Sequence, residues 1–130
     1  MGIVRTLLAL LIAVPAGATS ASAAAAPIGD PLPFFAACTG RLSAEMEFQW
    51  LTGDPDAART EALRRAMIDI LEALTPAEQA PGIMHRRVAA KAAHAALLAT
   101  AVFGPDPRAS EAAADRAREL RDGCIGALLS

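Results

Sequence analysis

The chain has 130 residues, of which 12 are Lys or Arg and 14 are Asp or Glu, giving a formal net charge of −2. Because a weakly acidic chain has no electrostatic reason to bind nucleic acid or anionic lipid, we expect neither partner. Hydrophobic residues make up 54% of the chain and aromatic residues only 4%. Much of that hydrophobic share is alanine, which favours closely packed helices.

Residues 1–23 have the layout of a secretory signal peptide. Arg5 precedes the apolar stretch Thr6 to Val14, and small residues then lead to Ala21-Ser22-Ala23, the expected cleavage site. A membrane-spanning helix needs about 20 predominantly apolar residues, and this stretch is shorter. We therefore expect a periplasmic or secreted protein without stable membrane insertion, with about 107 residues left as one small domain.

Two cysteines, Cys38 and Cys124, remain after the predicted cleavage site. In an oxidising compartment such a pair forms a disulfide more often than a catalytic or metal-binding site. Their wide separation also excludes a Cys-x-x-Cys redox motif. We predict a disulfide between them, which would remove about 4 to 5 kcal/mol of unfolded-state entropy by loop-closure theory.

The remaining chain divides into a flexible segment at residues 24–32 and a helical domain at residues 33–130. A first helix is expected from about Pro33 to Leu51, ending at the breaker cluster Thr52-Gly53-Asp54-Pro55. Its apolar face carries Phe35, Cys38, Leu42, Met46 and either Gln49 or Trp50. A second helix starts near Asp54 or Pro55, and its expected buried face carries Leu63, Met67, Ile70, Leu71 and Leu74.

Proline and glycine mark the later boundaries. Thr75-Pro76-Ala77-Glu78 has the form of a capping box, opening a helical turn that Pro81-Gly82 breaks. A third helix spans Ile83 to Phe103, and its expected buried stripe is Met84, Val88, Ala92, Ala95, Leu98 and Val102. Asp106 caps a fourth helix that begins at Pro107. The expected buried face of that helix is Ala113, Ala117, Leu120, Cys124 and Leu128.

No segment alternates between apolar and polar residues, so no sheet is expected. The predicted fold is therefore all-α, an up-down four-helix bundle with one disulfide between the first and last helices. In such a bundle the start of the first helix lies beside the end of the fourth. Cys38 and Cys124 both fall on apolar faces there, so helical periodicity and the cysteine pair independently predict the same packing.

Gly40 is unusual inside a helix, where glycine costs about 1 kcal/mol relative to alanine. We expect the compensation to be close approach of another helix backbone, brought in by the disulfide. The surrounding pattern Cys38-x-Gly40-Arg41-x-Ser43-Ala44, followed by Glu47 and Trp50, resembles small exported bacterial helical proteins. The resemblance extends to about Leu74 and supports only the compartment. It implies no activity and no site residue.

Polar residues recur on two of the predicted helices. Arg41 and Glu45 are four apart on the first, and Lys91 and His94 are three apart on the third. If these helices run parallel, Glu45 lies near His94, and Arg41 lies near Lys91. This arrangement would form a partly buried polar pocket. The alternative is that both stripes are solvated flanks of amphipathic helices.

Catalytic and metal-binding signals are weak. The two histidines, His85 and His94, lie on different faces of one helix, and there is no covalent haem motif or paired Glu-x-x-His. Nucleophile elbows and phosphate-binding glycine loops are also missing. We predict no enzyme activity, no catalytic residue, no metal and no cofactor. A rival reading is a metal or haem carrier that uses Met46, Met84 and His94.

Aromatic residues supply the remaining functional signal. Phe34, Phe35, Phe48 and Trp50 share one predicted helix, which cannot bury all of them on a single face. Phe48 and Trp50 are therefore the predicted interaction surface. The function expected is that of a small non-catalytic binding or accessory protein of the cell envelope, engaging another envelope protein. An envelope stress chaperone that opens at low pH is a third alternative, and the oligomeric state is left open.

Overall fold

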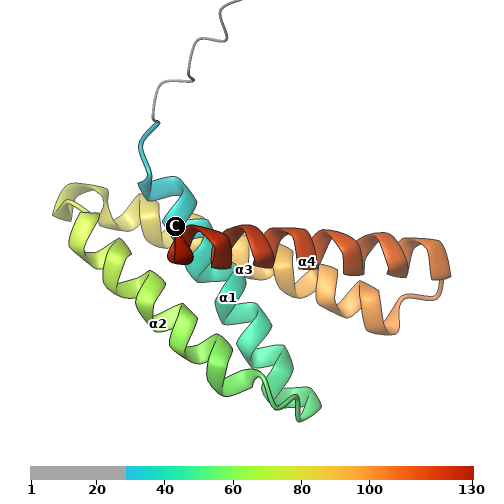
Figure 1. Ribbon diagram of the computed structural model, residues 1–130. Helices are drawn as coiled ribbons and strands as arrows, with labels where there is room; N and C mark the ends of the chain where they lie inside the picture. Colours follow the sequence, from blue (N-terminus) through green and yellow to red (C-terminus); the bar gives the residue numbers. More distant parts are fainter. Residues whose placement is uncertain (1–28) are drawn as a thin grey trace, which may run out of the picture.

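The computed structural model describes residues 29–130, so the predicted signal peptide lies outside the described residues. Four helices follow one another: α1 (Leu32–Thr52), α2 (Ala57–Leu74), α3 (Ala80–Phe103) and α4 (Pro107–Leu129) (Figure 1). A short 3₁₀ turn, η1 (Ala77–Gln79), precedes α3. The described residues contain no strand, and the all-α prediction is confirmed.

Consecutive helices run antiparallel, and the α1–α2 pair crosses the α3–α4 pair at an angle (Figure 1). Helix α1 contacts all three of the other helices, and its packing against α3 is the most extensive helix–helix contact. Its contact with α4 is smaller. Helix α1 is therefore the central element of the fold.

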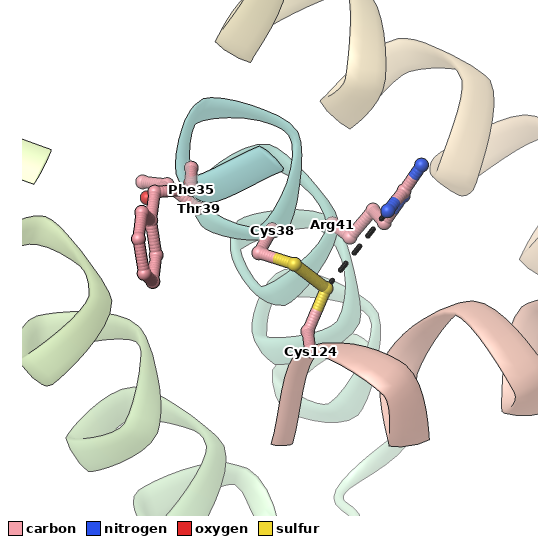
Figure 2. Close-up of a disulfide and its surroundings, with 5 residues drawn as sticks. All are labelled: Phe35, Cys38, Thr39, Arg41 and Cys124. Carbon is pink, nitrogen blue, oxygen red and sulfur yellow. Dashed lines mark hydrogen bonds between the residues drawn. A yellow bond between two sulfur atoms is a disulfide. The ribbon is translucent and has the colours of Figure 1, made fainter. Parts of the chain in front are cut away.

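The predicted disulfide joins the first and last helices (Figure 2). The Cα atoms of Cys38 and Cys124 are 5.4 Å apart, and both residues are buried. Leu42 of α1 and Met67 of α2 complete a hydrophobic cluster around the two sulfurs. The disulfide thus forms part of the core and holds α4 against α1 where their direct contact is small.

A second hydrophobic cluster lies at the start of α1. Leu32 and Ala36 pack there against Leu71 of α2, and Ile83 of α3 covers them. Phe35 packs against both clusters and thereby connects them.

Gly40 marks the crossing of α1 and α3. A Cβ atom at this position would lie 2.2 Å from the carbonyl oxygen of Arg87 and 2.8 Å from the backbone nitrogen of Lys91. Real Cβ atoms do not approach backbone so closely, so only glycine fits without displacing α3. The predicted close approach is confirmed. The helix concerned is α3, however, and not the disulfide-linked α4.

Several helix boundaries follow the predicted signals. Gly53 adopts a left-handed conformation, with φ of 70°, and ends α1. Asp106 caps α4 by accepting a hydrogen bond from the backbone N–H of Arg108, and Pro107 is the first helical residue. Residues 24–28 of the predicted flexible segment lie outside the described residues, and α1 begins at Leu32, one residue before its predicted start.

The capping box predicted at Thr75 does not form. The Thr75 hydroxyl donates to the carbonyl oxygen of Leu71, one turn back, and η1 has no side-chain cap. Pro81-Gly82 was also predicted to end the helical turn that precedes the third helix. Both residues instead lie in the first turn of α3. Proline is tolerated there because the first helical N–H groups have no partner inside the helix.

The buried face of α3 differs most from its prediction. Of the expected stripe only Leu98 is buried, and the rest is exposed: Met84, Val88, Ala92, Ala95 and Val102. The helix instead turns the side containing His94 toward α1, because the crossing at Gly40 brings α1 against Ala90 and the backbone of Lys91. Leu74, expected in the core at the end of α2, is also largely exposed.

The disulfide is tested by the double variant Cys38→Ala with Cys124→Ala, which leaves no thiol to mispair. Removing a disulfide from a small exported domain costs about 2 to 5 kcal/mol. We therefore expect Tm to fall by about 10 °C or more, measured by circular dichroism. Reduced wild-type protein is the matched control and should behave alike. A fall of no more than about 2 °C in both samples would contradict the stabilising role.

Candidate functional site

A largely buried cluster of polar and charged side chains joins three helices beside the α1–α3 crossing. Glu45 of α1 and His94 of α3 are 7% and 1% exposed, and His94 Nε2 lies 2.9 Å from Glu45 Oε2. Because an ionised carboxylate can only accept hydrogen bonds, Nε2 is the donor. The structure thus brings together two of the four residues of the predicted polar pocket.

Arg121 of α4 is the third member of this cluster, and sequence reasoning missed it. Its guanidinium lies 3.5 Å from Glu45 Oε1, and its Nε donates to Asp122. Burial lowers the pKa of Arg121, but the hydrogen bond and charge of Asp122, together with Glu45, raise it overall. Arg121 precedes Cys124 by one helical turn, so the disulfide itself was the signal that could have placed it beside α1.

The cluster leaves two buried polar atoms without a hydrogen-bond partner among residues 29–130: His94 Nδ1 and Gln49 Oε1. Gln49 lies one turn beyond Glu45 on α1 and is itself buried. A buried acceptor without a hydrogen-bond partner costs free energy. Packing elsewhere in the fold must offset this cost.

The other two residues of the predicted pocket have different partners. Lys91 Nζ donates to Glu47 Oε1 over 2.6 Å, in a half-exposed ion pair between α3 and α1. Arg41 points to the disulfide, and its NH1 lies 3.9 Å from Cys124 Sγ (Figure 2). Burial, followed by the charge of Arg116, lowers the pKa of Arg41.

The geometry of the cluster suits a structural role. His94 is only 1% exposed, and Glu45, 7% exposed, lines the inner wall of a small groove between α1, α3 and α4. Each satisfies the other across the interface between α1 and α3. We call the hydrogen-bonded pair of Glu45 and His94 the polar lock, because it links α1 to α3.

The ligand set of the rival metal or haem carrier is not assembled. Met84 lies ten residues before His94 on α3, about 15 Å along the helix, and is 54% exposed while His94 is buried. Met46 is buried on α1. Among residues 29–130, no group of three or more His, Cys, Asp or Glu side chains is arranged to hold a metal ion.

Two surface grooves lie near the cluster. The larger, of about 420 Å³, lies between the end of α1, the start of α2 and the end of α4. It is lined by Gln49, Asp56, Arg59, Thr60, Leu63, Arg121, Asp122, Ile125, Gly126 and Leu129. The smaller, of about 220 Å³, lies between α1, α3 and α4, and Phe48 forms part of its wall.

The predicted interaction residues lie at the end of α1. Trp50 is 56% exposed, and Phe48 is half-buried in the smaller groove. Leu51, which the sequence analysis did not single out, is 86% exposed. Phe34, at the start of α1, is 42% exposed and packs edge-on against Phe35.

Within residues 29–130, no helix has the length and apolar character needed to cross a bilayer. Comparisons of the chain with protein-family models, curated proteins and solved structures found no match. The resemblance to small exported bacterial proteins therefore stays a prediction.

The polar lock is tested by a pair of variants. His94→Leu leaves the Glu45 carboxylate buried with only the more distant Arg121, so we expect a loss of about 2 to 4 kcal/mol in denaturant unfolding. The double variant Glu45→Leu with His94→Leu removes both polar groups and should recover much of that loss. Lys91→Met, which removes the half-exposed pair, is the control and should cost less than about 1 kcal/mol. Equal losses of unfolding free energy for His94→Leu and Lys91→Met would contradict the stabilising role of the polar lock.

Proposed function

We propose that this chain is an exported, non-catalytic binding or accessory protein of the cell envelope that engages another protein through the end of α1. The observation that carries the proposal is that two consecutive large apolar residues are exposed. Trp50 is 56% exposed and Leu51 is 86% exposed. Exposed tryptophans are enriched at the energetic centres of protein interfaces.

The surroundings of these residues support a protein partner. Gln49, the residue before Trp50, lines the larger groove, and Leu129, 77% exposed, lines the same groove. Its lining also includes the apolar side chains Leu63 and Ile125 together with charged residues of both signs. An apolar patch with a charged rim has the composition of a protein-binding surface.

Export is supported by the disulfide, since disulfides persist in oxidising compartments. A non-catalytic role is supported by the burial of His94, which is 1% exposed. The larger groove has no histidine or cysteine in its lining. Binding is therefore the activity that the exposed side chains favour.

Site-specific photo-cross-linking tests this proposal. A photoreactive phenylalanine analogue at position 50 should yield one discrete adduct with another envelope protein. The same analogue at Ala66, an exposed position on α2, is the matched control and should yield none. Adding Leu51→Ala to the position-50 probe should reduce the yield, because it removes exposed apolar area at the contact.

Fractionation and mass analysis accompany the cross-linking. The adduct should be recovered outside the cytoplasm, and the chain that has not cross-linked should have the mass expected for cleavage after Ala23. The proposed surface is wrong if the two probe positions give the same adducts. Recovery of the uncleaved chain from the cytosol alone would contradict export.

A further inference from the structure

The side of α3 that faces away from α1 carries no charge over four turns. Between Val88 and Phe103 the exposed residues, which we call the outer α3 face, are Val88, Ala89, Ala92, Ala93, Ala95, Ala96, Ala99, Thr100, Val102 and Phe103. The exposed residues of α2 and α4 include many charges, such as Arg65 and Asp69 on α2 and Asp115 and Arg118 on α4. The outer α3 face is therefore an apolar helix surface that no element within residues 29–130 covers.

Large side chains lie at the two ends of this face and alanines lie between them. Val88 is 57% exposed at one end, and Val102 and Phe103 are 57% and 76% exposed at the other. The stretch of 16 residues is about 24 Å long. Small residues along the middle let a second helix approach closely, whereas the larger residues fill the space at each end.

We propose that the outer α3 face binds a second copy of this chain, with the two α3 helices antiparallel about a two-fold axis near Ala95 and Ala96. A two-fold axis at this point pairs each residue with the position equally far on its other side. Val88 then lies opposite Phe103 of the second copy, and Ala92 lies opposite Ala99. At each end Val88 thus meets Phe103 and Val102 meets Ala89, and in the middle Ala92 and Ala95 each meet an alanine.

Charge complementarity favours the same antiparallel register. His85 and Arg86 lie just before the face, and Asp106 lies just after α3, all three being exposed. The two-fold axis brings the end of α3 that carries His85 and Arg86 beside the opposite end of the second copy's α3, which Asp106 follows after the turn at Gly104. Lys91, the nearest ammonium group, is already paired with Glu47 of its own chain. No like charges meet along the face itself.

The available area sets the strength expected of this dimer. An outward third of a helix surface about 24 Å long amounts to about 350 Å² per copy, below the roughly 800 Å² per partner of a standard interface. Val102 also lines the smaller groove with Phe48 and Ala114, so the apolar surface continues beyond α3. A reversible dimer with a dissociation constant of about 10 to 100 µM is therefore expected.

Sedimentation equilibrium of the purified, disulfide-bonded protein tests the proposal between about 5 and 500 µM. The wild-type protein should pass from monomer to dimer over this range. Ala95→Glu places two carboxylates together at the two-fold axis and should stay monomeric throughout. Because position 95 is exposed and glutamate is a good helix former, circular dichroism should show unchanged helix content. Ala66→Glu on α2 is the matched control and should dimerise like wild type.

Two further samples keep the test decisive. An equimolar mixture of Ala95→Glu and Ala95→Lys should form a heterodimer although each variant alone is monomeric. Phe103→Ala, which removes an exposed side chain, should weaken the dimer about fivefold or more.

A wild-type protein that stays monomeric at about 500 µM, or an Ala95→Glu variant that dimerises like wild type, would overturn the proposal. The outer α3 face does not include the end of α1. A Trp50→Ala variant should therefore dimerise normally, so failure of this proposal and failure of the proposed function are distinguishable.

Discussion

At Gly40 the backbone of α1 lies so close to α3 that a Cβ atom would stand 2.2 Å from the carbonyl oxygen of Arg87. This backbone contact determines how the two helical pairs cross. Glu45, little more than one turn further along α1, consequently reaches His94 on α3, and the buried pair fixes the rotation of both helices. The conformational cost of glycine inside a helix is offset by packing that no larger residue permits.

The disulfide completes this arrangement from the other side of α1. It anchors α4 where direct packing with α1 is limited, and it carries Arg121 toward Glu45. With α2, α3 and α4 all attached to it, α1 is largely enclosed except at its ends. Among the exposed large apolar residues, Trp50 and Leu51 lie at the end of α1, and Val88, Val102 and Phe103 lie on the outer α3 face. These are the residues on which the two proposed interaction surfaces rest.

Sequence periodicity was sufficient for the four helices, because proline and glycine mark their ends and apolar residues recur at helical spacing. It was also sufficient for the disulfide, since Cys38 and Cys124 fall on apolar faces. It failed for α3, where Met84, Val88 and Val102 form a more apolar stripe than the side that is buried. Burial of His94 is made possible by a carboxylate on another helix, and a pairing of that kind leaves no signal in the local pattern. For the same reason, Gly40 predicted a close contact without indicating which helix makes it.

The most direct test of this account is the free energy of unfolding of Gly40→Ala, measured by denaturant titration of the disulfide-bonded protein. Alanine has the higher helix propensity, so an unpacked helix would gain about 1 kcal/mol from this change. The close approach of α3 reverses the sign, because the added methyl group must displace the backbone at Arg87 and Lys91. We expect a loss of about 2 kcal/mol or more. An unchanged or increased stability would show that α1 and α3 do not meet at Gly40.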